Sequence, residues 1–254
     1  MLADFLTVDF ALLIAIGFAA QLVDGALGMA FGVISTTAML ALGLPPAQAS
    51  AITHTAEIFT TAASGTSHLY HRNVDWRLVF RLGLAGVIGA VLGAWVLSNV
   101  DGQAIRPFVF AYLLAVGTLI LLKAARRAPS RDVSFSIAPP LGFAGGFLDA
   151  IGGGGWGPVV TSTLIGSGQA ARTAVGSVNV TEFFVTAAAA TTFFVELGAS
   201  PLRELLALVV GGVLAAPFGG WLVKYLSPRF LMTMVGLLVV TLALWQIARA
   251  LKLV

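Results

Sequence analysis

The sequence LVDGALGMAFG at residues 22–32 has a counterpart, FLDAIGGGGWG, at residues 147–157. Both stretches place an aspartate inside an apolar segment and follow it with glycines. Identical residues that lie 125 positions apart include Asp24 and Asp149, Gly28 and Gly153, and Glu57 and Glu182. A carboxylate at the centre of a membrane helix costs roughly 2.5–3.5 kcal/mol on insertion scales. The repetition therefore indicates two related halves, residues 1–127 and 128–254, and it indicates that the acidic residues inside their apolar segments have a function.

The composition indicates an all-α, polytopic membrane protein. Of 254 residues, 58% are hydrophobic and 10% are charged, and the mean hydropathy is +0.97. A soluble domain carries about 25% charged residues. The net charge of +3 comes from basic loops between apolar segments and does not indicate a nucleic-acid surface. Cysteine is absent and only three histidines occur, so we expect no disulfide, no cofactor and no resident metal.

The apolar pattern predicts ten helical segments, five in each half. They run near 8–27, 29–43, 47–70, 77–98, 105–123, 137–152, 155–166, 171–195, 203–223 and 229–248. A straight crossing needs about 20 residues, and the second segment of each half is too short for one. A glycine-containing break precedes each short segment: residues 25–28 form the first break and residues 152–155 the second. Discontinuous or re-entrant helices are therefore expected, with their irregular backbone buried in protein or lining a cavity.

Charges in the loops predict opposite orientations for the two halves. The loop at 71–81 contains three arginines, and the linker at 123–132 is also strongly basic, so both are expected inside. The loop at 196–204, equivalent to the first of these, is net negative and is expected outside, whereas the loop at 224–229 is basic and expected inside. Such an inverted repeat is the usual plan of a secondary transporter.

The same argument places both termini outside a cell inner (plasma) membrane. The N-terminus lacks the basic region of a signal peptide, so the segment that starts near Val8 is expected to be a retained first helix. Arg249 and Lys252 near the C-terminus argue against this orientation.

Two short motifs form the strongest candidate site. His54-Thr55-Ala56-Glu57 is followed 125 residues later by Asn179-Val180-Thr181-Glu182. Residues three apart share a helix face, so each motif presents a hydrogen-bonding side chain and a carboxylate to one spot. In an inverted repeat the two spots are expected to meet near mid-membrane. The expected substrate-binding residues are His54, Glu57, Asn179 and Glu182, with Thr55 and Thr181 nearby. The alternative is a polar pair that holds two helices together with its glutamates protonated.

The residues at the breaks have two interpretations. Asp24 and Asp149 either cap helix starts, because a carboxylate accepts backbone N–H bonds, or bind the substrate directly. Gly28 and Gly153 are expected to belong to the helix break or to gating. The free amides of a helix start bind anions without a basic side chain, and no Lys or Arg lies well inside an apolar segment. Gln21, one turn before Asp24, is a weaker candidate for the same site.

Enzymatic activity is not expected. The chain contains no Walker sequence, nucleophile elbow or HExxH zinc motif. Three other functions remain open: an anion carrier, a cation or metal-ion transporter that uses Asp24, Glu57, Asp149 and Glu182 as ionised ligands, and a membrane scaffold without transport. If the substrate is an anion, two ionised glutamates would repel it. At least one is then expected to carry a proton, which could couple transport to the proton gradient.

At these residues the chain resembles the TauE/SafE family of sulfite and organosulfonate exporters. The resemblance rests on the segments from Asp24 to Gly32 and from Asp149 to Gly157, and on the two motifs ending at Glu57 and Glu182. It implies export of a small sulfur-containing anion, such as sulfite or sulfoacetate, by alternating access and as a homodimer. One departure is that the first break, Ala26-Leu27-Gly28-Met29-Ala30, contains fewer glycines than its counterpart.

Overall fold

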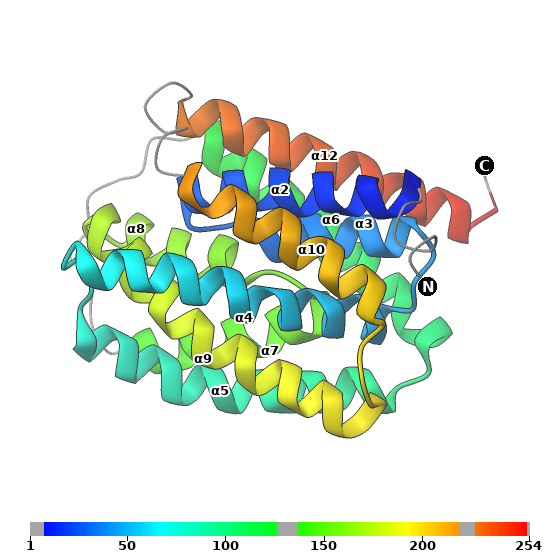
Figure 1. Cartoon of the computed structure of the whole chain (residues 1–254), viewed down its shortest axis with the longest axis horizontal. Helices are drawn as coiled ribbons and strands as arrows, with labels where there is room; N and C mark the ends of the chain where they lie inside the picture. Colours follow the sequence, from blue (N-terminus) through cyan, green and yellow to red (C-terminus); the bar gives the residue numbers. More distant parts are fainter. Residues whose placement is uncertain (1–7, 126–136, 219–226, 253–254) are drawn as a thin grey trace.

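The computed structural model describes residues 8–125, 137–218 and 227–252, which are all-helical and contain no strand, as predicted (Figure 1). The elements are α2 (Val8–Leu27), α3 (Phe31–Ala41), α4 (Pro46–Tyr70), α5 (Trp76–Asn99), α6 (Gly102–Ala125), α7 (Ala138–Gly152), the π-helix η2 (Gly157–Thr161), α8 (Ser162–Gly166), α9 (Ala171–Leu197), α10 (Leu202–Ala215), the 3-10 helix η3 (Ala216–Phe218) and α12 (Pro228–Ala250). By length and composition, five helices in the described part are able to cross a membrane: α2, α5, α6, α9 and α12.

Short helices follow both glycine breaks, as the segment lengths predict. α3 has 11 residues, and η2 and α8 have five each. Neither α3 nor the pair of η2 and α8 reaches the length of about 20 residues that a straight crossing needs. Their re-entrant character and the inverted orientation of the halves stay predictions. Lys123 lies at the end of α6, whereas Arg126, Arg127 and Arg131 of the central linker, the boundary between residues 127 and 128, and Lys224 lie outside the described residues.

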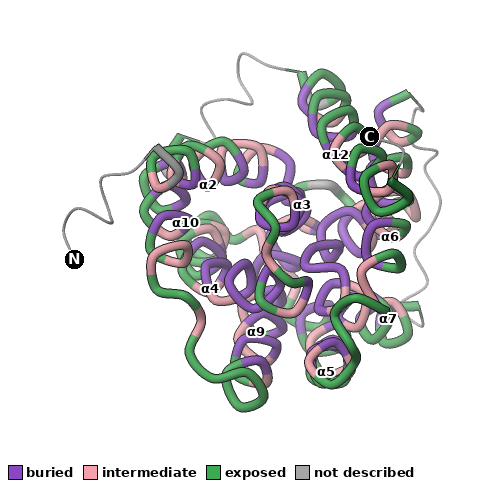
Figure 2. Tube along the Cα trace, turned by 90° about the vertical axis from the view of Figure 1, so that its right-hand side faces the viewer, coloured by how far each residue is buried: buried purple, intermediate pink, exposed green. Residues whose placement is uncertain are grey.

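α4 and α9 pack against each other in the middle of the bundle. α4 is 25 residues long but too polar to count among the five apolar spans, because its buried face includes hydroxyl, imidazole and carboxyl groups. Figure 2 shows buried segments toward the middle of the bundle and exposed segments around its rim. A helix enclosed by other helices is shielded from lipid, so polar side chains on it do not need to face hydrocarbon.

The outer helix α5 illustrates how the rim is built. Its large apolar residues Trp76, Phe80, Leu84 and Ile88 recur every fourth position and are all more than half exposed. Its opposite face carries buried glycines and alanines that contact the backbone of α7. Small residues let membrane helices approach closely while large apolar ones face lipid.

Exchanging the two halves leaves the main pairs of packed helices the same. α5 packs against α7 and α9, and α10 packs against the counterparts of these helices, α2 and α4. The remaining main pairs, α4 with α9 and α6 with α12, consist of counterparts. A Cβ added to Gly17 would meet the Leu208 carbonyl, and one added to Gly142 would meet the Leu82 carbonyl. Such swapped pairs are the packing expected of halves related by a pseudo-twofold axis.

Candidate functional site

The two glycine breaks contact each other reciprocally. The Thr36 hydroxyl of α3 donates a hydrogen bond to the Gly153 carbonyl. The Thr161 hydroxyl of η2 donates to the Gly28 carbonyl at 3.3 Å. Thr36 and Thr161 are 125 residues apart, as are Gly28 and Gly153. The same hydrogen bond is therefore made in both directions between the halves.

Two further glycines allow the broken segments to approach at backbone distance. A Cβ at Gly32 would lie 2.8 Å from the Cα of Gly154, and a Cβ at Gly157 would lie 2.6 Å from the Cα of Met29. These contacts are again counterparts, and any side chain at either position would push the segments apart. The breaks thus form one interlocked junction in the protein interior, where irregular backbone is tolerated in a membrane protein.

Asp24 and Asp149 bond to the starts of the short segments. Asp149 Oδ1 accepts from the Trp156 amide at 2.9 Å, just before η2. Asp24 Oδ1 accepts from the Phe31 amide, the first of α3, at the longer distance of 3.4 Å. Each acceptor lies seven residues before its donor. Both aspartates are buried and accept a backbone N–H at the start of a short segment, as the capping interpretation expects, and a direct role in substrate binding stays a prediction.

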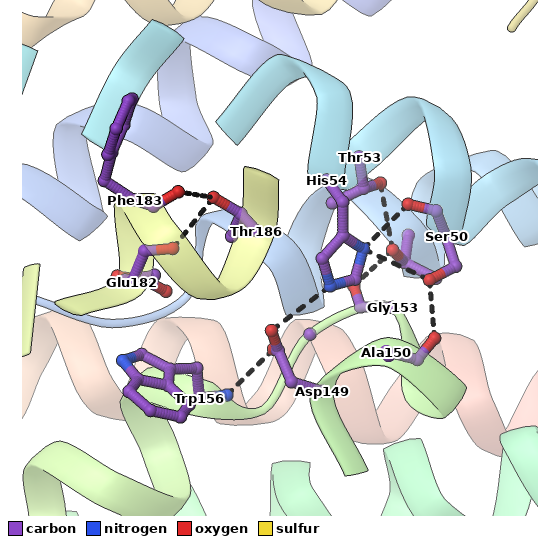
Figure 3. Close-up of polar contacts among 12 residues, drawn as sticks. Ser50, Thr53, His54, Asp149, Ala150, Gly153, Trp156, Glu182, Phe183 and Thr186 are labelled. Carbon is purple, nitrogen blue, oxygen red and sulfur yellow. Dashed lines mark hydrogen bonds and ion pairs between the residues drawn. The ribbon is translucent and has the colours of Figure 1, made fainter. Parts of the chain in front are cut away.

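His54 joins α4 to the second break (Figure 3). Its Nδ1 lies 2.8 Å from the Ser50 carbonyl oxygen, which only accepts, so Nδ1 is a donor. Its Nε2 lies 3.2 Å from Asp149 Oδ2. One proton therefore lies between Nε2 and the carboxylate, and the pair is net neutral whichever partner holds the proton. The imidazole is fully buried and contacts the Phe193 ring.

Both candidate glutamates are buried beside this pair. Glu57 is 3% exposed, and its Oε2 has no hydrogen-bond partner. Ligand atoms of His54, Glu57 and Asp149 all lie within 4.8 Å of one another, a spacing that would also suit a cation. Glu182 is 7% exposed and lies within electrostatic range of Asp24, Glu57 and Asp149. Figure 3 shows His54 and Glu182 on opposite sides above the loop from Asp149 to Trp156.

The remaining predicted residues already have local partners. Asn179 Nδ2 donates to the Val175 carbonyl at 3.0 Å, and Asn179 Oδ1 accepts from Ser64 at 2.8 Å. The Thr55 and Thr181 hydroxyls donate to carbonyls of their own helices at 2.7 Å. Gln21 is fully buried, and neither of its amide atoms has a hydrogen-bond partner.

Several residues at the junction were not predicted from the sequence. Thr36 and Thr161 were detectable, because they share the 125-residue separation of the acids. Tyr112 of α6 donates to the Gly154 carbonyl at 3.1 Å, and Ser50 donates to the Ala150 carbonyl at 2.7 Å. No repeated pattern marks Tyr112 or Ser50, since neither has a similar residue 125 positions later.

The family follows from comparison with known proteins. A family model described as sulfite exporter TauE/SafE matches residues 13–245. The chain belongs to the TauE/SafE family. Its relative in Bacillus subtilis (strain 168), named probable membrane transporter protein YtnM, is 42% identical over 230 residues, which cover 87% of this chain and 77% of that protein. No solved structure matches significantly.

Membership of the TauE/SafE family makes this chain a multi-pass membrane transporter. The junction of the two breaks, with its buried imidazole and carboxyl groups, is the polar centre of the transporter.

Proposed function

We propose that the protein exports a small sulfur-containing anion (sulfite, sulfoacetate or another organosulfonate) by alternating access. In this proposal residues 1–127 and 128–254 are inverted repeats in the inner (plasma) membrane, both termini are outside, and the working unit is a homodimer. The observation that carries the proposal is the reciprocal junction of the breaks beside His54, Glu57, Asp149 and Glu182. A binding site between two related halves is what an alternating carrier requires.

The chemistry of the junction supports an anion held without a fixed cation. No lysine or arginine in the described ranges is buried. The candidate donors are the second N–H of the Asn179 amide and, once the aspartate caps move away, the backbone amides at the starts of α3 and η2. Carboxyl oxygens of Asp24 and Asp149 occupy two of those amides in this structure, and a sulfite or sulfonate group presents oxygens of the same kind. The family's description as a sulfite exporter favours this class of substrate.

In this proposal one of the two glutamates carries a proton. Ionised Glu57 and Glu182 would repel an anion bound between them, so at least one carries a proton while the substrate is bound. The unpartnered Oε2 of Glu57 is free to carry it. If this proton leaves with the anion, both move in the same direction across the membrane, and the proton gradient then enters the driving force for transport.

The reciprocity of the junction supports an alternating mechanism. The side chains of His54, Glu57, Asp149 and Glu182 are at most 7% exposed, which supports a conformation that is closed to both sides of the membrane. Opening toward one side would break one of the two threonine–glycine hydrogen bonds and keep the other as a hinge. Opening toward the other side would reverse their roles.

The proposal is tested by efflux of sulfite and of sulfoacetate from proteoliposomes at several external pH values. We expect saturable efflux that slows or loses its pH dependence in Glu57→Gln and Glu182→Gln. Glu196→Gln is the matched control, because Glu196 is exposed at the end of α9 and bonds only to Asn99 in the described contacts. Wild-type rates and pH dependence in both site variants would remove the glutamates from the mechanism.

A second candidate is a cation or metal-ion transporter. The close spacing of His54, Glu57 and Asp149 favours it, since two carboxylates and an imidazole can share one divalent ion. Thermal stabilisation separates the two, because a bound ligand stabilises the folded protein. Stabilisation by Mn²⁺ or Zn²⁺ that disappears in His54→Gln, with none by sulfite or sulfonates, would favour the cation transporter.

A further inference from the structure

A second polar pocket lies at one end of the bundle and contains none of the candidate site residues. It has a volume of about 290 Å³ and lies where α3 and α12 end and α6 begins. Arg106 enters it from the start of α6, and Trp245, Gln246 and Arg249 enter it from the last two turns of α12. Figure 1 shows these three helices together on one side of the molecule.

The pocket contains polar groups that the protein itself does not satisfy. Gln246 is only 4% exposed, yet neither atom of its side-chain amide has a hydrogen-bond partner. Arg106 donates from Nη2 to the Leu44 carbonyl at 3.3 Å, but its Nε is buried without a partner. Buried polar groups in folded proteins nearly always have partners. Two arginines and an amide that converge in one pocket suit an anionic oxygen ligand.

An apolar pocket adjoins the polar one. It has a volume of about 370 Å³ and is lined by Leu12 and Ile16 of α2, by Leu42 at the end of α3, and by Leu242 and Trp245 of α12. Trp245 belongs to both pockets, and the Arg249 guanidinium lies 5.4 Å from the centre of its ring. A phospholipid could place its acidic headgroup in the polar pocket and an acyl chain in the apolar pocket. A free anion would occupy the polar pocket alone.

We propose that the two pockets together bind one anionic phospholipid. Its phosphate lies between Arg106, Arg249 and the Gln246 amide, and an acyl chain follows the apolar pocket along α2 and α12. The polar pocket lies at the ends of helices that are able to cross a membrane, where headgroups and interfacial tryptophans are expected. On the cytoplasmic side of membranes, basic pockets between helices bind acidic headgroups, and a phosphate in the other leaflet offers the same charge.

A lipid phosphate would also explain why basic residues lie at this end of the bundle, although the loop charges predict that this end is outside. Arg106 and Arg249 would be present to hold a lipid phosphate rather than to set orientation. The proposal is independent of which ion crosses the junction, because the two pockets share no residue with it.

The test is native mass spectrometry of the purified protein titrated with phosphatidylglycerol or phosphatidylcholine, with thermal stability measured in parallel. We expect one phosphatidylglycerol to bind in preference and to raise the unfolding temperature. The combined variant Arg106→Gln and Arg249→Gln should lose about thirtyfold in affinity, because each basic residue near the headgroups strengthens binding by about fivefold. The combined Arg→Lys variant keeps both charges and should retain most of the binding, and its melting without lipid shows whether replacing the arginines disturbs the fold.

Arg229→Gln is the matched control, since Arg229 lies exposed at the opposite end of the same helix. It should bind phosphatidylglycerol like the wild type. Equal binding of both lipids, or unchanged binding in the combined Gln variant, would overturn the proposal. Stabilisation by inorganic phosphate or glycerol phosphate to the same extent would show a pocket for free anions instead. A lipid-free dimer that the combined Gln variant abolishes would show that a second copy fills the pocket.

Discussion

Asp149 and Asp24 occupy equivalent positions but are expected to differ greatly in their contribution to stability. Asp149→Ala removes the 2.9 Å bond to the Trp156 amide, and loss of such a cap costs about 1 kcal/mol. The replacement also leaves His54 Nε2 without its hydrogen-bond partner, and an unsatisfied buried polar group lowers the free energy of unfolding by about 1–3 kcal/mol. Together the free energy of unfolding should fall by about 2–4 kcal/mol.

Asp24→Ala removes only the Phe31 bond, whose 3.4 Å length exceeds the usual range of about 2.7–3.2 Å. We expect a loss of about 0.5 kcal/mol or less from so weak a cap. Both replacements remove one buried carboxyl group, so any gain from relieving its burial enters both variants and largely cancels in the comparison. The difference between them therefore measures the His54 contact and the stronger cap.

The assay is thermal unfolding of both variants in one detergent, followed by tryptophan fluorescence. For a chain of about 250 residues, each kcal/mol lowers the midpoint by about 2–4 °C. The midpoint of Asp149→Ala should therefore lie about 3–16 °C below that of Asp24→Ala by the same conversion. Asp149→Asn keeps the cap oxygen and can donate to a neutral His54, so it should fall between them. Equal shifts in the two alanine variants would refute the assignment of His54 to Asp149.

Three further changes probe the junction, each read from the same unfolding curves. Ala30→Gly should raise stability by up to about 1 kcal/mol, because Ala30 has a φ of 109°, a left-handed conformation that only glycine adopts without strain. Tyr112→Phe should cost about 1 kcal/mol by removing the bond to the Gly154 carbonyl. Ser64→Ala should cost about 0.5–1.5 kcal/mol by removing the donor to Asn179 Oδ1, and a loss beyond that range would mean that Ser64 has another role.

The helices and their order were predictable because membrane helices follow hydropathy closely. The apolar segments near 8–27 and 171–195 correspond to α2 and α9 within two residues at each end. The short lengths of α3 and of η2 with α8 were predictable from the position of the glycine breaks. Separation by 125 residues also selected the acids, which lie together because helices of the two halves pack as swapped pairs.

The partners of the predicted site residues were not predictable in the same way. Helical spacing places His54 and Glu57 on one face, but it does not say which helix that face meets. The sequence predicts that this motif lies near Asn179 and Glu182, and α4 and α9 do pack together, but it does not indicate that His54 also bonds to Asp149 of α7 or that Asn179 bonds to Ser64 of α4. These contacts depend on how far each helix is rotated about its axis, which hydropathy does not determine.

The break with fewer glycines differs from its counterpart in backbone as well as in composition. The first break has positive φ at Gly28 and Ala30, and the second at Gly153 and Gly154. The two breaks reach the same reciprocal contacts by different local conformations, with strain at Ala30 in the first. Equivalent hydrogen bonds therefore did not require equivalent loops, and sequence identity at the break underestimates how closely the halves correspond.

The asymmetry between the halves bears directly on how the transporter would open. The counterpart of the His54–Asp149 pair would be Asn179 with Asp24, but Asn179 is bonded within α9 and to α4 instead. α4 also contacts α7 more extensively than their counterparts α9 and α2 contact each other. The α4–α7 side of the site is thus held by a hydrogen-bonded acid–imidazole pair, whereas the described contacts include no such pair on the α2–α9 side. Two openings that break unlike contacts differ in free energy, so we expect the α2–α9 side to open more readily than the α4–α7 side until the proton shared by His54 moves.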